Sequence, residues 1–317
     1  MYELKQIPED FIVEEVTNRE FNNGRYAMFL LNKRNYNTED AIIRLSDFLR
    51  VQRKNISYAG TKDRNALTSQ YITISGVPKQ DIELKDISLK YVGETSSPLS
   101  LGDLLGNNFV ITIRNIDSDK IKILPISEFI NYFDTQRFSK NNADIGKAII
   151  KKDYKKACEL LLEEESVISN KIKERLSKNA NAFLNALKIV PRKVLLIYVH
   201  AYQSLLWNRV VELLEKESIV EVPLIGFGVE LIGRIKEEYE KILTVEKLTQ
   251  RDFILRDFPE ISLEGANRLV RAEIKNLKID DMIDDDLNSG MKKVTLRFFL
   301  SKGVYATLAI KNIVVEN

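Results

Sequence analysis

Tyr58-Ala-Gly-Thr-Lys-Asp-Arg-Asn-Ala-Leu-Thr-Ser-Gln-Tyr71-Ile-Thr-Ile-Ser75 joins two strand-like patterns through a charged turn. A short apolar run at 56–59 leads into it, and polar and apolar residues alternate over 71–75. Both patterns predict β-strands. Gly60 permits a sharp turn between them, and the charged residues 62–64 must be accessible to water or to a ligand. The segment therefore predicts a hairpin whose loop carries charged groups.

Asp63 is the candidate reactive group in this loop. Lys62 and Arg64 flank it in sequence, and positive neighbours favour the ionised form of a carboxyl group. An ionised carboxylate suits a nucleophile or an anchoring base better than a general acid. The alternative is a solvated hairpin whose charges only keep the turn soluble, and the composition of the loop alone favours that alternative.

The pattern Gly60-x-Lys-Asp63-x-x-Ala-x-Thr-x-Gln70 resembles the catalytic-loop signature of the TruD family of tRNA pseudouridine synthases. Further motifs of that family recur in order from Lys5 to Thr307. The resemblance implies an isomerase that converts uridine to pseudouridine in tRNA, at uridine 13, and it places the catalytic aspartate at Asp63. The implied partner is tRNA, and the implied reaction uses no cofactor.

The N-terminal segment Lys5-x-x-Pro-Glu-Asp-Phe11-x-Val-x-Glu15 resembles another motif of the family. The resemblance implies that Lys5 lies near the catalytic Asp63 and that Phe11 helps to form the uridine pocket. A lysine ammonium there stabilises a charged carboxylate, and an aromatic ring can stack on a flipped pyrimidine. Without the resemblance, this segment reads as a half-buried edge strand.

Two later segments complete the implied pocket. Gly-Asn107-x-Phe109-x-Ile-x-x-Arg resembles the motif whose asparagine binds the target uridine, and Gly303-Val-Tyr305-Ala-Thr resembles the motif whose aromatic residue contacts it. A carboxamide at Asn107 can pair with both donor and acceptor on the uracil edge, and Phe109 is expected to stack or to form a wall. In the alternative interpretation Asn107 is a turn residue, and Phe109 and Tyr305 are core residues without a functional role.

Two motifs in the middle of the chain also resemble the family. Residues 131–139 depart from it at Asp134 and Ser139, where the family has glycines, and both are poor replacements if the backbone requires a positive φ. Residues 198–209 predict a buried helix in which His200 is structural. Its expected internal polar positions are Gln203, Asn208 and Arg209.

The composition excludes several classes of site. A single cysteine, Cys158, excludes an internal disulfide, and with a single histidine it excludes a cysteine- or histidine-rich metal site, so no metal is expected. Gly226-Phe-Gly228 lacks the third glycine of a dinucleotide-binding loop, so no nucleotide cofactor is expected. No secretory signal or membrane-spanning run is visible, and we expect a cytoplasmic protein without a membrane partner.

An RNA partner requires positive charge gathered on one face, because 48 basic and 46 acidic residues leave a net charge of only +2. The densest basic patch falls on an expected helix, which offers either phosphate contacts or an ordinary exposed face. The candidate contacts with the RNA backbone are Lys62, Arg64, Lys151, Lys152, Lys155 and Lys156.

The expected fold class is α+β in two domains, since 317 residues with 44% apolar content can bury a large core. Strand-rich segments at 1–130 and 285–317 bracket a mostly helical segment at 131–284. We therefore expect a catalytic domain assembled from both chain ends, with a second domain inserted in it. The resemblance implies a mixed, mainly antiparallel sheet that carries the catalytic loop in a central cleft.

Two other functions remain open from the sequence. A glycosidase could pair Asp63 with Glu14 or Glu15, which requires the two carboxyl groups to lie roughly 5–10 Å apart in one cleft. A non-catalytic RNA-binding or RNA-folding protein could retain the same scaffold. Comparison of the wild-type chain with an Asp63 variant separates the second case from an enzyme.

Overall fold

The computed structural model describes residues 2–316 and divides the chain into two compact units. Unit 1 combines the N-terminal part, up to Phe129, with the C-terminal part, from Ala272. Unit 2 is Ile130–Arg271. An insertion into a domain built from both chain ends is the organisation that the sequence predicts, and the first boundary lies one residue from the expected position.

The second boundary was predicted wrongly, because the sequence analysis assigned residues 272–284 to the inserted domain. In the structure β13 (Lys275–Ile279) and β14 (Ile283–Asp284) both pair antiparallel with β15 (Lys292–Ser301). β13 carries only a short alternation, in which Leu277 and Ile279 are partly buried against the core of unit 1, and β14 is two exposed residues long, so both strands give a weak signal in the sequence. Their place in unit 1 is decided by backbone pairing with β15.

Unit 1 is built on a ten-stranded sheet with the order β13-β15-β7-β1-β4-β2-β6-β5, while β14 pairs with β15 and β3 with β4. β1 and β4 are parallel, and the other paired strands of this sheet are antiparallel. The prediction of an α+β fold with a mixed, mainly antiparallel sheet is therefore confirmed. The bounds of the strands not yet given are β1 Phe11–Val16, β2 Tyr26–Arg34, β3 Ile56–Tyr58, β4 Leu67–Ile74, β5 Ile82–Leu84, β6 Ile87–Thr95 and β7 Gly106–Ile116.

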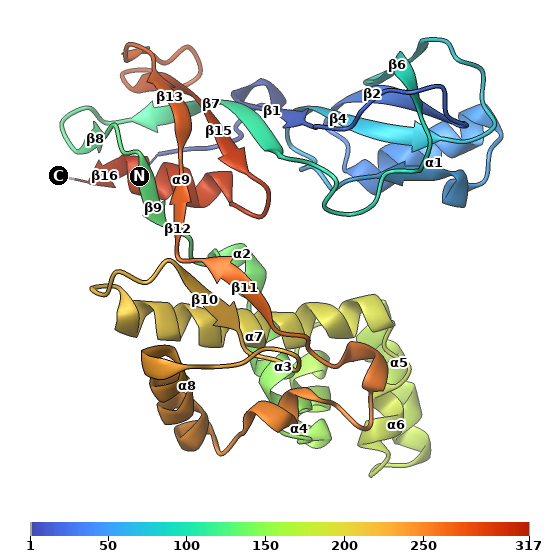
Figure 1. Ribbon diagram of the computed structural model, residues 1–317, viewed down its shortest axis with the longest axis vertical. Coiled ribbons are helices and arrows are strands. Elements are labelled where there is room, and N and C mark those ends of the chain that lie inside the picture. Colours follow the sequence, from blue (N-terminus) through green and yellow to red (C-terminus); the bar gives the residue numbers. More distant parts are fainter. Residues whose placement is uncertain (1, 317) are drawn as a thin grey trace. The chain divides into compact units, whose positions relative to one another are not determined.

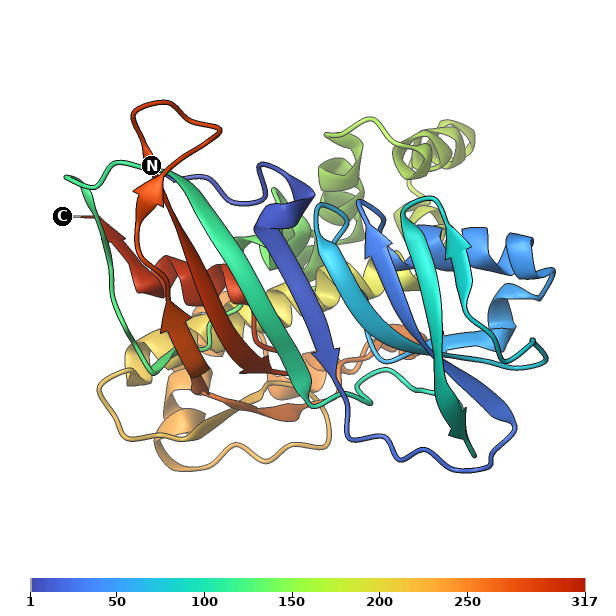
Figure 2. The same cartoon turned by 90° about the horizontal axis from the view of Figure 1, so that it is seen from above.

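Two helices cover the same side of this sheet, as Figures 1 and 2 both show. α9 (Ala306–Ile313) packs with β1, β7 and β15, and α1 (Thr38–Leu49) packs with β2, β3, β4 and β6. Each helix closes its own apolar cluster, so unit 1 has two cores beneath one continuous sheet. The loop that carries Asp63 follows β3 and precedes β4, near the junction between the two cores.

The smaller elements of unit 1 lie at its ends and connections. One-turn 3₁₀ helices occur at Pro8–Asp10 and Arg53–Asn55. β8 (Ile121–Ile123) pairs with β16 (Val314–Glu316). β9 (Glu128–Ile130) pairs with β12 (Arg271–Glu273) where the chain passes from one unit to the other.

Unit 2 is mostly helical and is organised around α7 (Arg192–Leu214), whose apolar residues lie nearly all round the helix. β10 (Glu221–Leu224) and β11 (Ala266–Leu269) form a two-stranded sheet in the same unit (Figure 1). The remaining helices are α2 Thr135–Phe138, α3 Asn142–Ile150, α4 Tyr154–Leu162, α5 Val167–Lys178, α6 Phe183–Leu187 and α8 Gly233–Glu246, with 3₁₀ turns at Gln250–Phe253 and Pro259–Ile261.

The polar residues predicted inside α7 have different environments. Gln203 is buried and donates to the backbone oxygens of Ile225, at 2.7 Å, and Glu264, at 3.1 Å. Asn208 exchanges two hydrogen bonds with the backbone of Phe133, at 2.9 and 3.0 Å. The prediction was wrong for Arg209, whose side chain is 46% exposed.

The two non-glycine residues at 134 and 139 adopt different conformations. Asp134 has φ −75° and caps α2, since its carboxylate accepts from Thr135 N at 2.7 Å. Ser139 has φ +44°, a backbone conformation that is unfavourable for residues other than glycine. Of the two positions, only this one therefore strains the backbone by lacking a glycine. Across residues 2–316, none of the helices combines the length and apolar character needed to cross a membrane.

Candidate active site

The Asp63 loop closes a hairpin, because β3 and β4 pair antiparallel from Ile56 opposite Ile74. Gly60 permits a sharp turn, as noted from the sequence, but the loop does not use the conformational freedom of a glycine there. The backbone of Gly60 lies outside the left-handed region, and a Cβ atom there would meet only the Lys62 Nζ, at 4.0 Å. The loop shape must therefore be held by other contacts.

Buried hydrogen bonds from Thr38 and Gln70 hold this loop. Gln70 Nε2 donates to the Gly60 oxygen at 2.9 Å, and its Oε1 accepts from Thr38 Oγ1 at 2.8 Å. Thr38 Oγ1 in turn accepts from the backbone N–H of Lys62 at 2.8 Å. The first residue of α1 and a residue of β4 thus fix the backbone immediately before Asp63.

Lys62 lies inside the protein, contrary to the prediction that it contacts the RNA backbone. Its ammonium forms a 2.6 Å ion pair with Glu15, and the two side chains are 6% and 0% exposed. The other oxygen of Glu15 accepts from Tyr71 N at 3.3 Å. Since its charge is already neutralised in the interior, Lys62 is not available to a phosphate.

This arrangement also removes the pair of carboxylates that a glycosidase requires. Glu15 is enclosed and paired with Lys62, whereas Glu14 is exposed and projects from the opposite face of β1, since side chains alternate along a strand. Asp63 therefore has no second carboxylate from β1 in a shared cleft.

Lys5 and Asp63 meet directly. The Lys5 ammonium forms an ion pair with Asp63 Oδ2, and the two side chains are 19% and 56% exposed. The same ammonium lies 4.0 Å from the centre of the Phe11 ring, in a cation–π contact. The charge of Lys5 thus contacts both an accessible carboxylate and an aromatic ring.

Arg114 holds the backbone on both sides of Lys5. Its backbone pairs with Glu3 through two hydrogen bonds of 2.9 and 3.0 Å, and its guanidinium donates to Asp10 at 2.7 Å. The same guanidinium contacts Asp285 at 2.7 Å. Lys5 itself has φ +59°, so this network secures a segment whose backbone is in the left-handed region.

The aromatic residues predicted for the pocket lie in the core. Phe11 and Phe109 contact edge to face with ring centres 6.1 Å apart, and Phe298 stacks on Phe109 at 5.4 Å. All three rings are buried, so neither Phe11 nor Phe109 presents a free face for stacking in this conformation. Sequence analysis missed Phe298, although the apolar alternation at 294–300 places it on the core face.

Asn107 carries an unpaired polar atom. It lies near the start of β7 opposite Glu15 and Leu300, and its Oδ1 is buried with no hydrogen-bond partner among residues 2–316. An unsatisfied buried acceptor costs about 1–3 kcal/mol, so its retention requires an explanation. Asn107 remains a predicted contact to the uracil edge.

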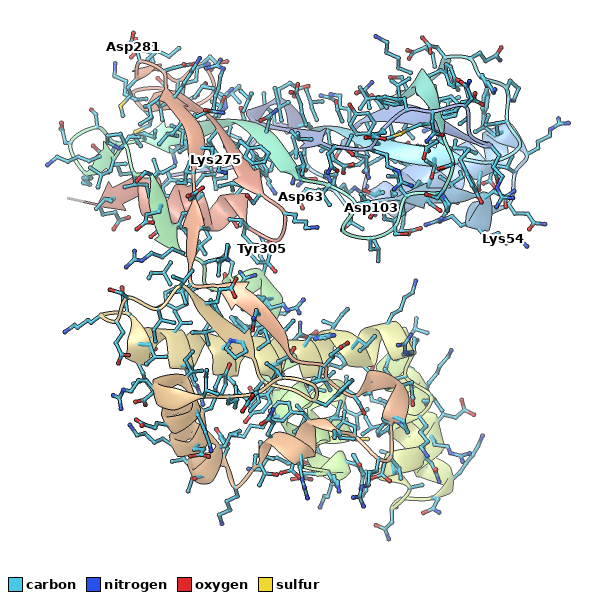
Figure 3. The ribbon with its side chains drawn as sticks, viewed as in Figure 1. Lys54, Asp63, Asp103, Lys275, Asp281 and Tyr305 are labelled. Carbon is cyan, nitrogen blue, oxygen red and sulfur yellow. The ribbon has the colours of Figure 1, made fainter. Side chains whose placement is uncertain are left out.

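Tyr305 is half-buried at the residue before α9. A bridging loop connects its neighbourhood to the Asp63 loop: Gly102 N donates to the Ala59 oxygen at 2.7 Å, and Lys302 Nζ donates to the Gly102 oxygen at 2.9 Å. Figure 3 draws Asp63 and Tyr305 towards the lower edge of unit 1. The contact of Tyr305 with the substrate stays a prediction.

The remaining predicted RNA contacts are at the surface. Arg64 is exposed, as are the lysines of the basic patch. The prediction that those lysines share one helix was wrong. Lys151 and Lys152 follow the end of α3, Lys152 has φ +59°, and Asp153 caps the start of α4, which carries Lys155 and Lys156.

Lys33 is a functional candidate that the sequence analysis missed. It lies in β2 opposite Thr68, is 3% exposed, and donates from Nζ to the Asp63 backbone oxygen at 2.8 Å. The signal was present, because Phe29, Leu31 and Lys33 occupy alternate positions and so share the core face.

His200 has a structural contact. Its Nδ1 lies 3.1 Å from Gln203 Oε1 on the same helix, and burial lowers the pKa of its imidazole. Over residues 2–316 there is no group of three or more histidine, cysteine or acidic residues that could hold a metal ion.

Comparison with known proteins identifies the family. The family model for tRNA pseudouridine synthase D (TruD) matches residues 2–175, 163–219 and 212–313. The probable tRNA pseudouridine synthase D 2 of Methanocaldococcus jannaschii is 33% identical over 97% of this chain and 90% of its own length. The tRNA pseudouridine synthase D of Leptospira interrogans is 29% identical over 100% of this chain and 97% of its own. A crystal structure described as tRNA pseudouridine synthase D from Methanosarcina mazei superposes with a TM-score of 0.77 at 27% identity, covering 98% of this chain and 93% of that one. The chain therefore belongs to the TruD family of tRNA pseudouridine synthases.

Proposed function

We propose that this chain converts uridine to pseudouridine in tRNA, at uridine 13, with Asp63 as the catalytic carboxylate. The observation that carries the proposal is the pairing of Asp63, 56% exposed, with the Lys5 ammonium on a loop fixed by buried hydrogen bonds. A carboxylate that is both accessible and held in place can act on a bound nucleotide. Family membership gives the reaction class.

The reaction breaks the N1–C1′ bond of uridine, turns the base and forms a C5–C1′ bond. The proton at C5 is lost and N1 gains one, so substrate and product are isomers. Asp63 acts on the sugar or the base while this bond is exchanged, and the Lys5 ammonium orients its carboxylate. The target base must first leave its stack, which costs a few kcal/mol that contacts in the pocket offset.

Asn107 provides the uracil contact in this proposal. Its unpaired buried Oδ1 accepts from a donor on the base, which removes the cost of leaving it unsatisfied. Tyr305 supplies the exposed part of the pocket wall. Phe11 and Phe109 do not stack on the base in this proposal. The buried Phe11 ring supports the Lys5 ammonium, and Phe109 packs against Phe11 beneath it.

The test is Asp63→Asn in a single-turnover assay with a tRNA transcript. We expect pseudouridine formation to be abolished while the Kd for tRNA stays within about threefold, because one atom changes and phosphate contacts dominate the affinity. Asp47→Asn, an exposed position on α1, is the matched control and should retain full activity.

A second transcript with cytidine at position 13 tests the site. We expect no pseudouridine in it. Modification at another uridine would contradict the uridine 13 assignment, and activity of Asp63→Asn near that of the wild type would remove Asp63 from the reaction.

A further inference from the structure

The Lys33 ammonium is enclosed, and within the described part of the chain its hydrogen bonds go only to backbone oxygens. It donates to the oxygens of Asp63 at 2.8 Å and Lys62 at 3.4 Å, and to that of Tyr36. Its exposure is 3%, and among residues 2–316 it forms no ion pair with a carboxylate. A lysine is rarely enclosed in this way without an acidic partner.

The three acceptors come from two separate segments. Lys62 and Asp63 are consecutive in the catalytic loop, and Tyr36 lies between β2 and α1. One ammonium therefore ties the carbonyl groups on both sides of the Asp63 Cα atom to the segment that leads into α1. Thr38 and Gln70 hold the loop before this point, so Lys33 is the contact that fixes Asp63 itself.

We propose that Lys33 is the positioning residue of Asp63, fixing the backbone from which the carboxylate projects and placing a second positive charge behind it. The proposal rests on the proposed function, since Asp63 must be the reacting carboxylate. Lys5 contacts the carboxylate from the exposed side, whereas Lys33 contacts the peptide from the interior. A displacement of about 1 Å at a reacting group can cost on the order of 100-fold in rate.

The charges around Lys33 make its protonation sensitive to pH. Burial lowers the pKa of Lys33 to about 8, Asp63 opposes that change, and the nearby Lys62 adds to it. Glu15 offsets the charge of Lys62, and Lys5 lies beyond Asp63. The ammonium is therefore charged at neutral pH and loses its proton as the pH rises through about 8.

Activity and stability then change in opposite directions. The pKa of Lys33 is lower in the folded chain than in the unfolded chain, so burial of its charge costs stability below pH 8 and that cost declines as the pH rises towards about 10.4. Deprotonation meanwhile weakens the hold on Asp63. A fall in rate above pH 8 without loss of stability thus distinguishes positioning from unfolding.

The experiment compares Lys33→Met with Lys90→Met in single-turnover pseudouridine formation from pH 6 to 10. Methionine is one atom shorter than lysine but has a similar unbranched shape and no charge. Lys90 is an exposed lysine on the adjacent β6. We expect the rate of Lys33→Met at pH 7 to fall by about 100-fold, with the Kd for tRNA within about threefold of the wild type. The wild type and Lys90→Met should lose activity above pH 8, and the residual rate of Lys33→Met should not change there.

A rate for Lys33→Met within threefold of the wild type, or an unchanged alkaline loss of activity in that variant, overturns the proposal. If Lys33→Met does not fold, Lys33→Arg is the test, because a guanidinium stays protonated over this pH range. The fall in its rate of pseudouridine formation should then begin above pH 9. A fall that still begins at pH 8 overturns the proposal. Absence of pseudouridine from wild-type reactions contradicts the proposed function, whereas an active wild type with an equally active Lys33→Met contradicts only the role of Lys33.

Discussion

Lys62 and Asp63 are neighbours in sequence with opposite environments. The Lys62 ammonium is enclosed with Glu15, and the Asp63 carboxylate is accessible and paired with Lys5. Exposed ion pairs contribute about 0–1 kcal/mol, whereas breaking a buried pair leaves an uncompensated charge and costs about 3–5 kcal/mol. The two pairs therefore have different roles: Lys62–Glu15 secures the loop, and Lys5–Asp63 belongs to the reactive surface.

Glu15→Gln tests the buried pair. Because the Lys62 ammonium would lose its counter-charge in the interior, we expect the free energy of unfolding to fall by about 3–5 kcal/mol in urea denaturation at pH 7. Glu14→Gln, at the adjacent exposed position, should change it by less than about 0.5 kcal/mol. Equal effects in the two variants would show that the pair does not hold the loop.

At the scale of elements, the basic patch is defined by a helix break. α3 ends at Ile150, and the capping carboxylate of Asp153 accepts from Lys156 N at 3.0 Å to begin α4. Lys151 lies 3.9 Å from Glu246, so its charge is partly neutralised. Lys152, Lys155 and Lys156 remain as the exposed cations of this corner.

Substitution of those three lysines by glutamine tests an RNA contact there. Each phosphate contact contributes about 0.7–0.9 to the slope of log Kd against log salt, so we expect the slope to fall by about 2–3. The control changes Lys178, Lys236 and Lys241, each of which already pairs with a glutamate on its own helix. The slope of the control variant should stay near that of the wild type. If the variant without the three patch lysines also keeps the wild-type slope, those lysines do not contact the RNA backbone.

At the scale of the molecule, unit 1 depends on contacts between distant parts of the chain. The Arg114 guanidinium joins Asp10 of the N-terminal segment to Asp285 and Asp286 of the C-terminal segment, each at 2.7 Å. Asp285 also accepts from Asn115 N at 2.9 Å. Burial of Asp285 raises the pKa of its carboxyl group, but hydrogen bonds from Asn115, Asn288, Leu287 and Arg114 outweigh it and lower that pKa well below its usual range.

Asp285→Asn should lower the free energy of unfolding at pH 7 by about 1–3 kcal/mol, since Arg114 keeps two other carboxylates. The folded-state pKa of Asp285 is depressed, so its stabilisation is present above pH 4 and is lost as the pH falls through the folded-state value. The difference between wild type and variant should therefore shrink below about pH 4 in denaturation curves. Asp281→Asn, an exposed position labelled in Figure 3, is the control, and a constant difference at all pH values would contradict this account.

Local patterns in the sequence were sufficient to predict a strand on each side of the Asp63 loop, at 56–59 and 71–75, although β4 begins earlier, at Leu67. They were also sufficient for the helical middle of the chain and the family. Alternation and helical periodicity depend on neighbouring residues, and the catalytic-loop motif lies within one short segment. The mixed sheet followed from the resemblance, which carries information about long-range pairing that periodicity does not. The same local patterns did not identify β13 and β14, because the alternation of Leu277 and Ile279 is short and β14 has only two residues.

The tertiary structure alone decided which charges are enclosed and what they contact. Lys33 lies 30 residues from Asp63, Glu15 lies 47 from Lys62, and Arg114 lies 171 from Asp285. Strand register and order bring these groups together, and a shift of one residue would move each side chain to the other face. Sequence therefore determined that a carboxylate stands in an exposed loop, whereas the sheet determined which lysine is accessible, which is paired and which holds the loop from within.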